Sequence, residues 1–230
     1  MKRLFFFFSI IVTTSTAALA QDSMTPKMAV PPRSAYGDGG GAEVFVTAFA
    51  LLPTQATGNG ISEQATKAGG GSAGYRFHLR PSSALEGRYG FSRNSQKYTI
   101  GDTVYSIPVY QSEISGSYVY TFGKTHRVQP FLLGGGGILL FSPTNYAGTG
   151  DSAVGAAPPA YGGSSSGLPR QTKPMFLYGA GADLRLSSRL NFRVEFRALG
   201  SKTPDFGVTA LQTGSFAFIY VPSAGVAFLF

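Results

Sequence analysis

The last eight residues constrain the fold of this chain more than any other stretch. Val226, Phe228 and Phe230 recur at every second position, and mostly smaller residues fill the alternate positions. In a β-strand this spacing places the two sets on opposite faces. A chain end exposed to water is normally polar and loosely held. An apolar face that runs to the last residue therefore requires an apolar cover, which is either the core of a soluble sandwich or the hydrocarbon of a membrane.

The first 20 residues have the pattern of a secretory signal peptide. Lys2 and Arg3 precede an apolar run at residues 4–12, and Ala18-Leu19-Ala20 forms an A-x-A cleavage pattern. The apolar run is too short to span a bilayer as a helix. We therefore expect residues 1–20 to be removed and the mature chain to begin at Gln21.

Composition narrows the class of protein. The chain has no Cys, so a disulfide framework and a lipid-modified amino terminus are both excluded. It has 19 Lys and Arg against 11 Asp and Glu, and loss of Lys2 and Arg3 with the signal peptide leaves a net charge of +6. This excess suits anionic lipid headgroups, but it does not indicate a nucleic-acid partner, and we expect none. No later apolar run has the length of a membrane helix, so an all-β chain is expected.

Eight strand-like segments follow a leader at residues 21–42. The leader is rich in Pro, Gly and small polar residues and has no apolar periodicity, which predicts a flexible periplasmic segment. The expected domain organisation is therefore a signal peptide (1–20), a leader (21–42) and a β-barrel (43–230). The expected strands are residues 43–52, 72–80, 84–92, 109–122, 127–141, 175–186, 190–198 and 215–230.

The connections between these segments alternate in length. Tight turns join the second to the third strand, the fourth to the fifth and the sixth to the seventh, and the other four connections are long and polar. The longest, residues 142–174, contains a low-complexity stretch at 156–167. All long loops therefore leave from one rim of a closed barrel and all tight turns from the other. Membrane barrels have this asymmetry, with short periplasmic turns and longer outer loops.

Side-chain size predicts which face lies outside. In the seventh strand Leu190, Phe192, Val194 and Phe196 alternate with polar and charged residues, a pattern that a soluble barrel would also show with the faces reversed. Eight strands enclose little more than a side-chain-filled interior. The bulky aromatic set would crowd that interior, whereas the small and charged set fits it. We therefore expect the aromatic residues to face lipid and the charged residues to face the lumen.

With its signal peptide, eight strands, loop asymmetry and terminal Phe, the chain resembles the OmpA-type and OmpX-like eight-stranded outer-membrane proteins. The resemblance covers about residues 43–230. It does not include the peptidoglycan-binding domain that follows the barrel in OmpA. It implies an all-β fold, an eight-stranded antiparallel up-and-down transmembrane β-barrel in the cell outer membrane. It also implies that Ser223, Gly225, Phe228 and Phe230 form an assembly signal, which the barrel-assembly machinery reads during insertion.

Charged residues are predicted to line the lumen. Six Arg and four carboxylates share a narrow space of low dielectric, where unpaired charge is unfavourable. One interpretation is a salt-bridged network that plugs the barrel. The alternative is a narrow gated pore or a small apolar-solute channel, for which replacing Arg193 and Arg197 by Ala should raise conductance. The expected network consists of Arg76, Arg80, Glu86, Arg88, Glu113, Asp183, Arg185, Arg193, Glu195 and Arg197, with His78 on the same face.

Enzymatic chemistry is not expected. Some eight-stranded barrels modify lipid A, but hydrolysis needs a nucleophile, a base and an orienting group within reach of one another. The two histidines, His78 and His126, are both predicted near the periplasmic rim, away from the lipid A-bearing leaflet. No metal-ligand spacing is present, and no cofactor is expected. The expected function is structural or surface-interacting, carried out by a monomer whose outer loops are available to a surface ligand.

Overall fold

The computed structural model describes residues 41–122, 127–144 and 167–230. The predicted signal peptide, nearly all of the leader, His126 and most of the low-complexity stretch lie outside the described residues. The strands are β1 (Ala42–Pro53), β2 (Ala56–Gly58), β3 (Ile61–Ala65), β4 (Ala68–Arg80), β5 (Ser83–Ile100), β6 (Thr103–Thr121), β7 (Val128–Pro143), β8 (Gln171–Arg185), β9 (Leu190–Lys202) and β10 (Phe216–Leu229), and the single-turn helix η3 spans Thr209–Leu211.

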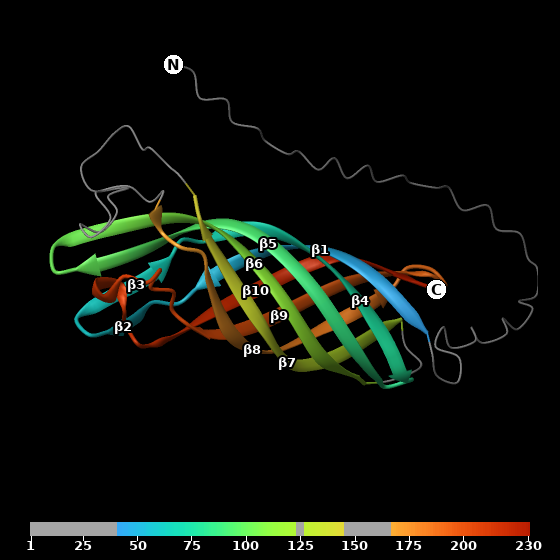
Figure 1. Cartoon of the computed structure of the whole chain (residues 1–230). Coiled ribbons are helices and arrows are strands. Elements are labelled where there is room, and N and C mark those ends of the chain that lie inside the picture. The colour runs from blue at the N-terminus through green and yellow to red at the C-terminus, as the bar shows by residue number, and fades with distance from the viewer. Residues whose placement is uncertain (1–40, 123–126, 145–166) are drawn as a thin grey trace, which may run out of the picture. The chain divides into compact units, whose positions relative to one another are not determined.

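Eight of these strands close into an antiparallel barrel (Figure 1). The order around the barrel is β1-β4-β5-β6-β7-β8-β9-β10, and β10 pairs with β1 to complete the circle. This confirms the predicted eight-stranded up-and-down architecture. No helix among the described residues is long and apolar enough to cross a membrane.

The first-to-last strand pairing depends on a glycine in the terminal segment. Gly225 lies opposite Thr47, and a Cβ atom on Gly225 would come within 2.1 Å of the Val46 carbonyl oxygen. At the end of the pair, the Phe230 backbone N–H donates to the Ala42 carbonyl at 3.0 Å. The small residue in the terminal pattern therefore permits the close backbone approach that closes the barrel.

Two of the connections predicted as long loops are instead ordered extensions of the sheet. Residues 93–108 continue β5 and β6 beyond the barrel wall to a two-residue turn, where Gly101 adopts a φ of 56°. Residues 54–67 contain the β2–β3 hairpin, whose turn residues Asn59 and Gly60 have φ values of 53° and 75°. Both extensions project from the long-loop end of the barrel (Figure 1). The prediction of long loops was wrong here, because polar residues occur on both faces of these segments and no clear alternation of polar and apolar residues marks them as strands.

Over most of the barrel wall the aromatic face lies outside and the charged face lines the lumen, as predicted. Aromatic side chains such as Tyr89, Tyr178 and Phe196 are exposed on the outside, at 52%, 53% and 49%. Four phenylalanines of the wall are exceptions, because Phe45, Phe49, Phe131 and Phe141 point inward and are at least nine-tenths buried. The size argument failed at the first three positions because each ring lies opposite a glycine, which provides the space for it.

Candidate functional site: the charged lumen and its outer closure

Strand register brings opposite charges together on neighbouring strands. Glu43 of β1 lies opposite Arg76 of β4, and Arg76 in turn lies opposite Glu86 of β5. The Arg76 guanidinium donates to Glu86 Oε2 from Nε at 2.9 Å and from Nη2 at 2.7 Å. On the opposite wall, Asp183 of β8 lies opposite Arg193 of β9. Arg193 donates to the two Asp183 carboxylate oxygens at 2.7 and 2.8 Å, which is the bidentate geometry that Arg favours.

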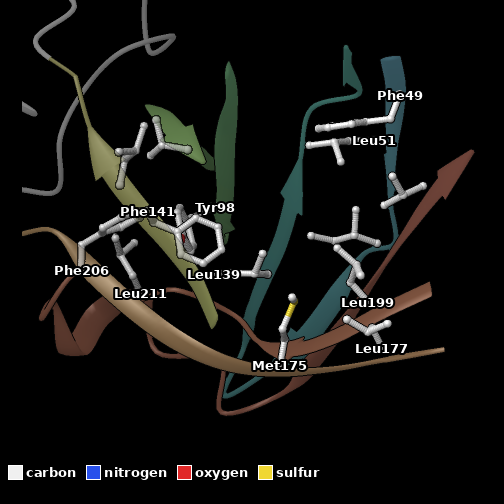
Figure 2. Packing of buried hydrophobic residues seen from close by; sticks show 14 of the residues in the cluster. Phe49, Leu51, Tyr98, Leu139, Phe141, Met175, Leu177, Leu199, Phe206 and Leu211 are labelled. Carbon is white, nitrogen blue, oxygen red and sulfur yellow. The ribbon is translucent and has the colours of Figure 1, made fainter. Parts of the chain in front are cut away.

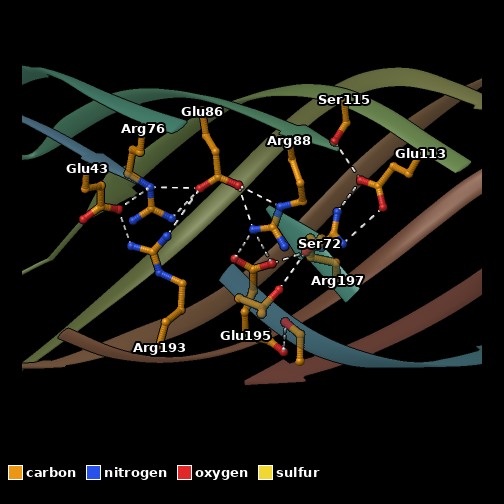
Figure 3. A network of polar contacts seen from close by, with 12 residues as sticks. Glu43, Ser72, Arg76, Glu86, Arg88, Glu113, Ser115, Arg193, Glu195 and Arg197 are labelled. Atoms are coloured by element: carbon orange, nitrogen blue, oxygen red, sulfur yellow. Dashed lines mark hydrogen bonds and ion pairs between the residues drawn. The ribbon is translucent and has the colours of Figure 1, made fainter. Parts of the chain in front are cut away.

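Further ion pairs cross the lumen and join the two walls. Arg193 donates a hydrogen bond from Nη2 to Glu43, and Arg76 Nη1 lies 3.4 Å from Asp183. Glu43, Arg76, Asp183 and Arg193 therefore form a closed ring in which each cation meets two or more carboxylates. Figure 3 shows the Glu43, Arg76 and Arg193 side of this ring. All four are almost completely buried.

The network continues toward the outer end through a second set of pairs. Arg88 Nη2 bridges Glu86 at 2.7 Å and Glu195 at 2.9 Å. Arg197 links Glu195, 3.0 Å from its Nε, to Glu113, which it contacts through both terminal nitrogens. Ser115 also donates to Glu113 at 2.7 Å. The chain of contacts thus runs along the barrel without a gap, as Figure 3 shows.

Two inward phenylalanine rings fill the space between the guanidinium groups. The Arg76 guanidinium carbon lies 4.6 Å from the Phe131 ring centroid, and that of Arg88 lies 4.7 Å from the Phe45 centroid. Arg193 contacts both rings, at 5.0 and 5.5 Å. Each contact is a cation–π geometry, which is more favourable where water is excluded. Ion pairs and rings together occupy the cross-section of the lumen.

The structure brings together eight of the ten residues that the sequence predicted for the network: Arg76, Glu86, Arg88, Glu113, Asp183, Arg193, Glu195 and Arg197. Arg80 lies outside, because β4 shifts register between His78 and Arg80 and leaves this side chain exposed next to the turn. Arg185 lies half-buried at the end of β8 and forms no ion pair among the described residues.

Sequence reasoning missed Glu43 as a member of the network. Its carboxylate is completely buried and pairs with Arg76 and Arg193. The signal was present, because Glu43 has the same parity as Phe45 and Thr47 in the first strand. His78 also lies in the lumen, with its Nε2 3.9 Å from Glu43 Oε2.

Above the charged network, the outer end of the lumen is apolar (Figure 2). Leu139 and Phe141 of β7 pack with Tyr98 of β5, and Met175, Leu177 and Leu199 lie along the neighbouring wall. A cavity of about 20 Å³ remains beside Leu139 and Phe141, and Glu63, Gln96 and Thr203 also line it. This volume is close to that of one water molecule, so it is no passage for solutes.

The segment between β9 and β10, which we call the outer cap (residues 203–215), folds over this apolar end. Phe206 and Leu211 are completely buried against Tyr98 and Phe141, as Figure 2 shows. Phe206 adopts a left-handed φ of 49°, a strained conformation for this residue type. Burial of its ring offsets that strain.

Polar contacts hold the outer cap in place. The Tyr98 hydroxyl donates to the Pro204 carbonyl at 2.6 Å, and burial raises the pKa of Tyr98. Gln171 of β8 donates to Asp205 at 2.6 Å and accepts from the Asp205 backbone N–H at 2.8 Å. Although burial opposes ionisation, the bonds from Gln171 and the Gly207 N–H hold the pKa of Asp205 below its ordinary value. The cap is therefore attached both to the β5–β6 extension and to β8.

Comparison with known proteins shows which family and which solved structures this barrel resembles. A family model described as the outer membrane protein beta-barrel domain matches residues 8–217. The solved structure of the outer membrane protein OprG from Pseudomonas aeruginosa is similar, with 12% identity and a TM-score of 0.57 over 85% of this chain and 98% of that one. Neisserial surface protein A (NspA) is also similar, with 14% identity and a TM-score of 0.51 over 80% and 96% of the two chains. These identities are low, so the likeness extends to the fold alone. A comparison with curated proteins gives no match.

Proposed function

The chain belongs to the outer membrane protein β-barrel family, and from this premise we propose that it is a closed barrel with a structural and surface-interacting role. The observation that carries the proposal is the double closure of the lumen. A charged network fills the part nearer the tight turns, and the apolar cluster under the outer cap fills the part nearer the long connections. A solute would have to break buried ion pairs and displace packed side chains to cross.

The surface that a partner would contact is the ordered extension above the outer rim. The β5–β6 hairpin and the β2–β3 hairpin are joined by the pairing of Glu63 with Tyr98 and its neighbours. The outer cap is bonded to the same platform through Ser215, which donates to the Thr57 carbonyl at 2.7 Å. A rigid platform costs less conformational entropy on binding than flexible loops do, so it suits surface contact.

Insertion into the membrane belongs to the same proposal. The signal peptide would direct export, and Ser223, Gly225, Phe228 and Phe230 would be read by the barrel-assembly machinery. Phe228 and Phe230 support this because they are exposed on the outside of the barrel, at 45% and 66%, where a protein partner can reach them before lipid covers them.

Bilayer conductance tests the double closure. We expect the wild-type protein to be silent. An Arg193→Ala/Arg197→Ala variant should also stay silent, because the outer closure remains, and so should a variant with residues 204–214 replaced by a short Gly-Ser linker. Combining the two changes should produce discrete conductance steps.

Each outcome bears on the alternative of a gated pore. Conductance in the Arg193→Ala/Arg197→Ala variant alone would show that the charged network is the gate, and it would contradict the closed-barrel proposal. A silent combined variant would contradict the assignment of the two closures. The heat-dependent mobility shift of a folded barrel on cold and boiled gels verifies that every variant has folded.

A further inference from the structure

We infer that the outer rim carries a binding site for the phosphate groups of an anionic lipid, formed by Lys67, Arg93 and Lys97 above an aromatic pair. The inference rests on the proposed orientation of the barrel in the membrane. It extends that proposal by naming the class of lipid and the part of the barrel wall that binds it.

An aromatic pair fixes the level of this site relative to the membrane. Phe91 of β5 and Tyr110 of β6 stack at 5.4 Å between ring centroids, and both are exposed on the outside. Aromatic side chains gather where the hydrocarbon meets the headgroups. The Arg93 guanidinium lies 5.6 Å from the Tyr110 ring, on the side of the long connections. Arg93 is therefore placed where lipid phosphates begin.

A break in the sheet creates a concavity at the same level. β4 pairs with β5 as far as Ser92, and β3 pairs with β5 from Gln96 onward, so residues 93–95 lie between two ladders. The resulting hollow has a volume of about 400 Å³ and is lined by Thr66, Arg93, Asn94, Ser95 and Pro108. The Ser95 backbone N–H donates to Thr66 Oγ1 at 2.9 Å, a bond that leaves the Thr66 hydroxyl proton for another acceptor.

Two further basic residues lie close in the chain to those that line the hollow. Lys67 follows Thr66 and is exposed, and Lys97 is exposed on the outer face of β5. Lys97 lies about 13 Å beyond Arg93 along the strand. A phosphate held by Arg93 in a forked contact would therefore have two further basic side chains in the same part of the rim.

None of the described residues forms an ion pair with these cations. Five of the carboxylates in the described ranges are buried in the lumen, Glu63 is buried under the outer cap, and Asp205 pairs with Lys173 at 3.3 Å. Asp102, at the tip of the β5–β6 hairpin, is the only remaining carboxylate of the described residues. The positive surface at Lys67, Arg93 and Lys97 therefore has no counter-charge among the described residues, and charge complementarity favours a lipid phosphate.

Native mass spectrometry of the full-length mature protein, released from detergent with diphosphorylated lipid A as the probe, tests the site. The wild-type protein should retain the lipid. Lys67→Gln/Arg93→Gln should lower retention by about tenfold or more, since each basic residue near an anionic membrane surface contributes about 1 kcal/mol. The matched control is Arg127→Gln/Arg189→Gln, which removes two exposed arginines at the tight-turn rim and should retain lipid like the wild type.

Three outcomes would overturn the inference. Equal retention by Lys67→Gln/Arg93→Gln would show that these residues do not hold the lipid. Equal loss in the control would show that only overall charge matters. Displacement of the lipid by millimolar inorganic phosphate would show a simple anion site. The conductance of these variants reports on the closed lumen independently, so failure of one proposal is distinguishable from failure of the other.

Discussion

Glu63 is a buried carboxyl group without an ion pair among the described residues. It lies on β3, outside the barrel wall, with only 3% of its surface exposed, and it lines the small cavity under the outer cap. Burial raises its pKa to about 7. Tyr98 lies opposite it on β5, Lys202 of β9 lines the same cavity, and Asp205 of the cap lies close to Tyr98. Ionisation of Glu63 would therefore place an unpaired negative charge beneath the cap.

We predict that the outer cap becomes less stable as the pH rises. The folded-state pKa of Glu63 lies above its ordinary value of 4.5, so the contribution is fully present below about pH 4.5 and is lost as the pH rises through about 7. The loss is on the order of 3 kcal/mol. Hydrogen exchange of the Phe206 and Leu211 amides should accelerate, after correction for intrinsic rates, between about pH 5 and about pH 8.

Glu63→Gln is the control for this prediction, because the amide has nearly the same shape and does not ionise. Its corrected exchange rates should be the same at both pH values. An equal pH response in Glu63→Gln and the wild type would assign the effect to another group and contradict the prediction.

At the scale of strands, cross-strand pairs of glycine and phenylalanine allow rings into a narrow lumen. Phe45 lies opposite Gly74, and Phe131 lies opposite Gly181. A Cβ atom at Gly74 would come within 2.3 Å of the Phe45 ring, and one at Gly181 within 2.4 Å of the Phe131 ring. The rings that contact the network arginines are thus positioned by the absence of a side chain on the neighbouring strand.

We expect Gly74→Ala and Gly181→Ala each to destabilise the barrel by about 1–3 kcal/mol, because the ring must leave its rotamer or the strands must separate. The measurement is the urea midpoint of unfolding in lipid vesicles. Gly87→Ala on β5 is the matched control, since a Cβ atom there meets no atom within 4 Å. A loss of stability in Gly87→Ala equal to that in the other two variants would point to strand propensity rather than to the rings.

Strand positions could be predicted from the sequence wherever one face contacts lipid. β9, with its alternation of Phe192, Val194 and Phe196 against charged residues, begins at the predicted residue. The outer half of β5 could not be recognised, because residues 93–100 extend beyond the barrel wall and both faces carry polar groups. The β2–β3 hairpin had a usable signal in Asn59-Gly60, a dipeptide that favours a tight hairpin turn.

At the scale of the molecule, the alternation of residues along each strand predicted which side chains line the lumen. It did not predict which of these side chains contact one another. Eight predicted charged residues form one network because their strands place them at matching heights. Arg80 has the right parity but lies beyond a register shift, which no local pattern reveals. The outer cap was not predicted at all, since the burial of Phe206 and Leu211 depends on β5, β7 and η3 meeting at one end of the barrel.

The ion pairs of the charged network affect the stability of the whole barrel. Removing one partner of a buried ion pair leaves an uncompensated charge, which costs about 3–5 kcal/mol, whereas replacing both partners by apolar groups of similar size is often neutral or stabilising. Arg197 and Glu113 are the most suitable pair, because they form the outer end of the network next to the apolar cluster.

We therefore predict that Arg197→Met lowers the free energy of unfolding in lipid vesicles by about 3–5 kcal/mol, because Glu113 keeps its charge and loses both guanidinium contacts. Arg197→Met/Glu113→Leu should recover most of that loss, since the apolar side chains extend the cluster downward. Glu195 retains its partner Arg88 at 2.9 Å in both variants, so the rest of the network stays paired. A double variant as unstable as Arg197→Met would mean that the specific ion pair, rather than the filling of the lumen, stabilises the barrel.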